Sequence, residues 1–86
     1  MDYIELKVSL TPFSQDLSDI LVAELADAGF ESFDDIENGF NGYIQENLFH
    51  ADIAHTVNQI ALDFGATATV EHQKIVTQNW LLKDKV

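Results

Sequence analysis

Carboxylates are the most concentrated reactive side chains of this 86-residue sequence, and their densest group is Asp34, Asp35 and Glu37. Paired carboxylates can carry out acid–base catalysis when burial drives their pKa values apart. These three residues lie beside two Asn-Gly pairs, which are typical of turns, where exposure to water provides no such tuning. We therefore expect this group to contact a partner rather than to transfer protons.

A second candidate site is the H-x-D-x-x-H spacing of His50, Asp52 and His55. Imidazole and carboxylate groups are suitable ligands for zinc or iron. The same spacing often arises by chance near a helix start, where Asp52 could equally serve as the cap. The sequence contains no cysteine, no glycine-rich phosphate loop and no nucleophile elbow. We expect no catalytic, cofactor-binding or metal-binding residue in this chain.

Charge is distributed unevenly along the chain, whose formal net charge is −11. Residues 1–73 contain 14 acidic residues and one lysine, whereas the last thirteen residues contain three lysines and one aspartate. Such an acidic surface repels phosphate backbones and attracts basic partners. The same charge would also serve solubility alone. The sequence therefore disfavours nucleic-acid binding and favours a basic protein as the partner.

The N-terminal stretch MDYIELK alternates polar and apolar residues. It lacks the basic start and continuous apolar run of a signal peptide, and no stretch of the chain reaches transmembrane length. We expect a cytoplasmic protein, with no membrane contact, that forms one domain.

Hydrophobic periodicity predicts the elements that position these side chains. Residues 3–10 alternate with period two, as in a half-buried strand. Apolar stripes at helical spacing cover residues 17–28 and 53–64, and each stripe is followed by a glycine, Gly29 or Gly65, suited to a helix C-cap.

Between the two helices, the sequence predicts a β-hairpin. The pairs Asn38-Gly39 and Asn41-Gly42 are both hairpin signals, so the position of the tip and the strand register stay open. With a last strand over residues 66–75, the order of elements is βαββαβ. This order predicts an α+β, ferredoxin-like fold: a four-stranded antiparallel sheet with the first and third strands central and both helices on one face.

The other face of this sheet would be polar and mainly acidic. It could be the ordinary wet side of an antiparallel sheet or a surface that binds a partner. The parity of the second strand is ambiguous, so its acidic residues are placed on this face only as an option. The partner-binding candidates from this face and the hairpin are Glu5, Asp34, Asp35, Glu37, Tyr43, Gln45 and Glu71.

The run LVAELADAGFESFDDIENGFNGYIQENLF (21–49), with the opening YIELKV, resembles the N-terminal domain of the methyltransferases that modify ribosomal protein L11. The resemblance covers most of residues 1–75 and implies a substrate-recognition domain there. Residues 76–86 would then be a tail or the start of a linker, and Gln78 to Trp80 resembles that linker. The sequence then departs from the family. An acidic segment that contains a second tryptophan is expected at this point, and LLKDKV stands in its place.

The resemblance also implies a function for the whole protein. Family members use S-adenosylmethionine, bound by a separate domain, to methylate a ribosomal protein. We expect this chain alone to be non-catalytic and to bind a basic protein of the large ribosomal subunit. The alternative is a ferredoxin-like regulatory or dimerisation domain: we expect a monomer, but the tail or an edge strand could form a homodimer. The run Trp80-Leu81-Leu82 has no predicted element to pack on.

Overall fold

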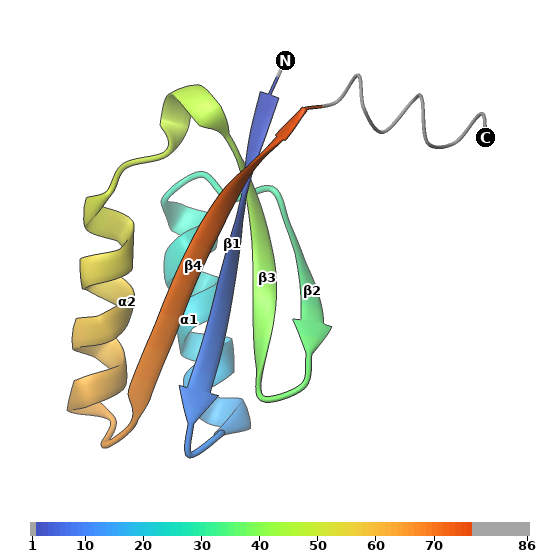
Figure 1. Ribbon diagram of the computed structural model, residues 1–86. Helices are drawn as coiled ribbons and strands as arrows, with labels where there is room; N and C mark the ends of the chain where they lie inside the picture. The colour runs from blue at the N-terminus through green and yellow to red at the C-terminus, as the bar shows by residue number, and fades with distance from the viewer. Residues whose placement is uncertain (1, 77–86) are drawn as a thin grey trace.

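Each predicted strand and helix forms close to the position that its sequence pattern indicates. The computed structural model describes residues 2–76 (Figure 1). Its elements in chain order are β1 (Asp2–Thr11), α1 (Gln15–Asp27), β2 (Ser32–Ile36), β3 (Gly39–Gln45), a short 3₁₀ turn η1 (Glu46–Leu48), α2 (Asp52–Asp63) and β4 (Thr67–Val76). Of the predicted tail, residues 76–86, Val76 ends β4, and residues 77–86, which include Trp80, Leu81 and Leu82, lie outside the described residues.

The four strands form one antiparallel sheet in the order β2-β3-β1-β4. The first and third strands are therefore central, and both helices cover the same face (Figure 1). This arrangement confirms the predicted ferredoxin-like fold. Because Asp2 pairs with Val76, the start of β1 and the end of β4 lie together at one end of the sheet.

The core lies between the sheet and the two helices. Alternation along β1 places its even-numbered apolar residues against the helices, where Leu6 and Val8 are fully buried. Helical spacing presents one apolar stripe of each helix to the sheet. The other large contributors are Phe40 and Ile44 of β3, Leu17, Leu21 and Leu25 of α1, and Ile53 and Val57 of α2.

Both helices end at a glycine, as the sequence predicted. Gly29 has φ 112° and Gly65 has φ 87°, a left-handed conformation that glycine adopts without a Cβ clash. After Gly29, the Phe30 N–H donates to the Leu25 carbonyl at 3.1 Å, which closes the last turn. The Ala66 N–H makes the equivalent bond at the end of α2.

The two helices begin differently. The Ser14 hydroxyl accepts a hydrogen bond of 3.3 Å from the Leu17 N–H and so caps α1. At α2 the cap position is Ala51, which has no side-chain acceptor, and Asp52 stands in the first turn. The option that Asp52 caps this helix is therefore wrong, although its charge suits the helix N-terminus.

The turn of the hairpin lies at the first Asn-Gly pair. Glu37 and Asn38 form the turn, with Asn38 at φ 63°, and Gly39 begins β3 opposite Ile36. A Cβ on Gly39 would collide with the Val8 carbonyl oxygen of the neighbouring strand, so a larger residue does not fit there without a shift of the backbone. The second pair lies inside β3, and β2 covers the five residues Ser32–Ile36.

Candidate protein-binding face

The side of the sheet away from the helices, which we call the open face, is polar and exposed or half-buried. Directly opposed residues of antiparallel strands point to the same side of a sheet, so the register assigns every member of this face. The side chains of this face are Tyr3, Glu5, Lys7, Ser9 and Thr11 of β1; Ser32, Asp34 and Ile36 of β2; Asn41, Tyr43 and Gln45 of β3; and Thr67, Thr69, Glu71, Gln73 and Ile75 of β4.

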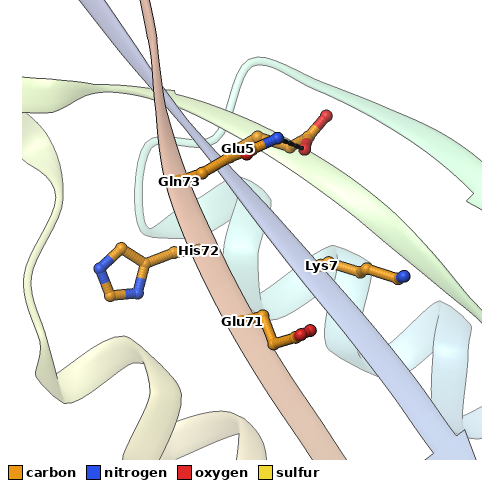
Figure 2. A pocket seen from close by; sticks show the side chains of 5 residues that line it. All are labelled: Glu5, Lys7, Glu71, His72 and Gln73. Atoms are coloured by element: carbon orange, nitrogen blue, oxygen red, sulfur yellow. Dashed lines mark hydrogen bonds between the residues drawn. The ribbon is translucent and has the colours of Figure 1, made fainter.

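Glu5 is the centre of one hydrogen-bond network on the open face. One carboxylate oxygen accepts from the Tyr43 hydroxyl at 3.0 Å. The other accepts from the Gln73 amide at 2.7 Å (Figure 2). The Tyr43 hydroxyl also lies 3.3 Å from a carboxylate oxygen of Asp34. A phenol has one hydrogen to donate, so Glu5 and Asp34 share a single donor. Residues that are far apart in the sequence are thus joined across β2, β3, β1 and β4.

The surroundings of Tyr43 raise the pKa of its phenol. Partial burial, followed by the hydrogen bond and charge of Glu5 and then by Asp34, raises the pKa of Tyr43 to about 12. The phenol is neutral near pH 7 even at the ordinary tyrosine pKa of about 10, and the shift keeps it protonated further into alkali, where it continues to donate to the carboxylates, which carry the negative charge of the face.

Glu31 forms a second network beside the first. Its carboxylate accepts from the Tyr3 hydroxyl at 3.0 Å and from the Gln45 amide at 2.8 Å. Its own N–H donates to the Tyr43 carbonyl at 2.8 Å, which holds it at the start of the hairpin. The hydrogen bond to Glu31 is also the main reason that the pKa of Tyr3 is raised. Sequence reasoning missed Glu31 because it precedes β2, where no alternation pattern assigns a face.

The register divides the predicted acidic group of the hairpin. Asp34 lies on the open face, whereas Asp35 is opposite Phe40, a core residue, and so points to the helix-covered side from the exposed edge of the sheet. Glu37 lies in the turn. The structure therefore brings Asp34 together with Glu5 and leaves Asp35 and Glu37 at the rim.

Glu71 belongs to a shallow hollow of about 230 Å³ on the β1–β4 side of the open face. Its lining also includes Glu5, Lys7 and Gln73, and Lys7 pairs in register with Glu71 (Figure 2). His72 borders the hollow but points to the other side of β4 (Figure 2), where its ring lies 5.0 Å from that of Phe49.

Negative charge dominates the open face. Residues 2–76 contain two lysines, and one of them, Lys74, pairs with Asp2 at 3.2 Å and Glu46 at 3.4 Å near the end of β4. The hydrogen bond to Asp2, followed by that to Glu46, raises the pKa of Lys74. Lys7 is thus the one cation that residues 2–76 place on the open face.

This arrangement is suited to binding cationic groups. Its carboxylates accept from neutral donors and retain further acceptor capacity toward solvent. Within residues 2–76, no three His, Asp or Glu side chains gather closely enough to hold a metal ion, and this includes His50, Asp52 and His55. Neither helix in the described part of the chain has the length and apolarity needed to cross a membrane.

Comparison with known proteins relates the chain to one kind of enzyme. A protein of Bacteroides fragilis named ribosomal protein L11 methyltransferase is 38% identical over 56 residues, which are 65% of this chain and 20% of that protein. Proteins of the same name from Bacteroides thetaiotaomicron and Phocaeicola vulgatus are 42% and 37% identical over 48 and 49 residues, each covering 17% of the relative. The similarity thus spans about a fifth of these relatives. No protein-family model matches the chain, and no solved structure gives a significant match.

Proposed function

We propose that this chain is the substrate-binding part of a ribosomal protein methyltransferase, and that its open face holds a basic ribosomal protein. The names of the three relatives support the reaction class and the substrate. The observation that carries the proposal is the open face itself. Three strands, β1, β2 and β4, bring Glu5, Asp34 and Glu71 onto one surface, Glu31 adjoins them, and Lys7 is the one cation among them.

Such a face acts on association in two ways. Its field attracts a positively charged protein over roughly a Debye length, about 8 Å at physiological ionic strength, and so raises the rate of encounter. On contact, lysine and arginine side chains donate to the carboxylates. Glu5 and Asp34 are well placed for this step because each carboxylate oxygen can accept more than one hydrogen bond, so both groups keep acceptor capacity for a partner.

We place the methyl transfer outside the described residues. S-adenosylmethionine, the methyl donor in such a reaction, is typically held by a glycine-rich turn that leads from a strand into a helix. The four glycines of this chain stand elsewhere: Gly29 and Gly65 follow helices, and Gly39 and Gly42 lie within β3. Residues 2–76 therefore do not fit this cofactor, and their proposed part in the reaction is to hold the protein substrate.

The proposal predicts that the 86-residue chain binds purified ribosomal protein L11 and that the open face determines the affinity. Calorimetric titration would compare the wild-type chain with the double variant Glu5→Gln/Asp34→Asn. Each removed charge is worth up to about 1 kcal/mol at an exposed contact, so we expect binding to weaken by about tenfold. The difference should shrink as salt is added.

A matched control variant has the same net charge as Glu5→Gln/Asp34→Asn. Asp16→Asn/Asp27→Asn removes two exposed carboxylates from α1, on the other side of the molecule, and should change the affinity by less than about twofold. Equal weakening by both double variants would show that net charge, not the open face, attracts L11. Absence of binding at low salt would refute the proposal.

A further inference from the structure

β4 is a long strand at one edge of the sheet (Figure 1), and within residues 2–76 no strand pairs with its outer side. It has ten residues, whereas β2, at the opposite edge of the sheet, has five. Its register with β1 is continuous from Thr67 to Val76, so β4 contains no bulge, and the only proline of the chain is Pro12. β4 thus lacks the short length, the bulge and the proline by which many edge strands avoid pairing with another chain.

The backbone of β1 shows which groups of β4 point outward. The Leu10 N–H donates to the Asn38 carbonyl oxygen, next to β3, at 2.8 Å, and the Val8 carbonyl oxygen faces Gly39 of β3. In an antiparallel sheet, the N–H and C=O groups of one residue point to the same side of the strand, and successive residues alternate. The even-numbered residues of β1 therefore direct their backbone groups toward β3, and the odd-numbered residues direct theirs toward β4.

The register between β1 and β4 carries this alternation to the outer edge. Leu6 is opposite His72, so the backbone groups of His72 do not bond to β1 and point away from it. The same holds for Val70 and Lys74, which have the same parity. Residues 71–74 are all exposed, even though the His72 and Lys74 side chains point to the helix side. The helices therefore leave this part of the edge accessible.

We propose that the outer edge of β4 binds an extended segment of the basic protein partner, which carries lysine or arginine and adds a fifth strand to the sheet. The inference rests on the proposed function, because it takes the same protein as the partner. Hydrogen bonds to the backbone of Val70, His72 and Lys74 provide affinity, and the side chains of the added strand provide selectivity. The open face and the edge of the sheet then hold one partner together.

Charge favours this partner over a second copy of the chain. A side chain of the added strand that lies opposite Glu71 points to the open face, beside the hollow lined by Glu5, Lys7 and Glu71 (Figure 2). These three residues carry two carboxylates and one amine, so a lysine or arginine opposite Glu71 is attracted and forms a cross-strand pair. Two identical chains, each with a net charge of −11, repel each other instead.

Amide hydrogen exchange, followed by NMR in the 86-residue chain with and without ribosomal protein L11, tests the edge residue by residue. The N–H groups of Val70 and His72 should exchange several-fold more slowly in the complex, because they donate to the added strand. The N–H groups of Thr69 and Glu71 already bond to β1, so they are internal controls and should change much less. Equal protection of all four, or no protection while L11 is bound, would refute the edge proposal and leave the proposed function intact.

A substitution at His72 tests the same edge by affinity. His72→Pro removes an outward N–H and places a ring against the added strand, but it removes no hydrogen bond to β1. We expect it to weaken L11 binding by about tenfold or more, whereas His72→Ala, which keeps the N–H, should change the affinity by less than about twofold. Equal affinities of the two variants would contradict the proposal. Circular dichroism checks that both fold, and the exchange pattern of the wild-type chain decides the question if His72→Pro does not.

Sedimentation of the free chain separates the remaining outcomes. We expect a monomer whose Val70 and His72 N–H groups exchange rapidly. A dimer in which these groups are protected without L11 would assign the edge to a second copy of the chain and overturn the proposal. Absence of L11 binding at low salt would refute the proposed function and this inference together.

Discussion

The two faces of the sheet are built from the same strands but differ in polarity and in exposure to water. On β1, the residues that point to the helices are apolar and nearly excluded from water, with 0% exposure for Leu6 and Val8. Their neighbours Glu5 and Lys7 point to the open face and contact water and other polar side chains. The free energy of folding therefore comes mainly from one face, and the charge available to a partner lies on the other. Substitutions at adjacent residues of one strand, which point to opposite faces, can test this division.

The largest effect is expected on the helix-covered face. Leu6→Ala removes a fully buried side chain from the centre of the sheet and should lower the free energy of unfolding by about 2–5 kcal/mol. Its neighbour on the open face provides the control, because Lys7→Ala should change stability by less than about 0.5 kcal/mol. Urea unfolding followed by circular dichroism measures both. Similar losses for the two variants would contradict the division between the faces.

A smaller effect is expected at Tyr43, where the open face is most ordered. Tyr43→Phe removes the hydroxyl that Glu5 and Asp34 share, so we expect a loss of about 0.5–1.5 kcal/mol in the same unfolding experiment. Tyr3→Phe removes an exposed hydrogen bond to Glu31 and should cost less. A loss at Tyr43 as large as that of Leu6→Ala would show that the open face also determines stability.

The last effect is a loss of stability that is absent at neutral pH and emerges only in alkali. Because the pKa of Tyr43 is raised to about 12 from a model-peptide value near 10, the folded state holds this proton more tightly than the unfolded state. The Tyr43 contribution is therefore complete below about pH 10 and is lost as the pH rises toward 12.

Tyrosinate absorbance follows this titration directly, since Tyr3 and Tyr43 are the only tyrosines. In Tyr3→Phe, the remaining midpoint should lie near 12, and the transition should move toward 10 when urea unfolds the chain. A midpoint near 10 in the folded chain would mean that the contact of Tyr43 with Glu5 does not persist in solution.

The sequence was informative wherever a pattern repeats within one element. Alternation over residues 3–10 and the helical stripes before Gly29 and Gly65 predicted β1, α1 and α2, because burial of one face requires that spacing. The order of elements then predicted the sheet topology, which the structure confirms. Glu5, Tyr43 and Glu71 were assigned to the open face by the same parity argument.

The hairpin was less predictable, because its two Asn-Gly pairs carry equal local signals. Tertiary structure decides between them: pairing with β1 places Phe40 opposite Val8 and Ile44 opposite Ile4, so that both enter the core. With the register fixed in this way, Asp34 joins the open face and Asp35 leaves it.

By itself, then, the sequence determined which elements form, how they are ordered, and that the surface is strongly acidic. Only the tertiary structure decided which carboxylates act together. Glu31, Glu5 and Asp34 come from separate parts of the chain and meet through Tyr3, Tyr43 and Gln45. The physical reason is that periodicity records burial within one element, whereas the position of a side chain beside another strand depends on register. Register, in turn, is set by packing across the whole sheet.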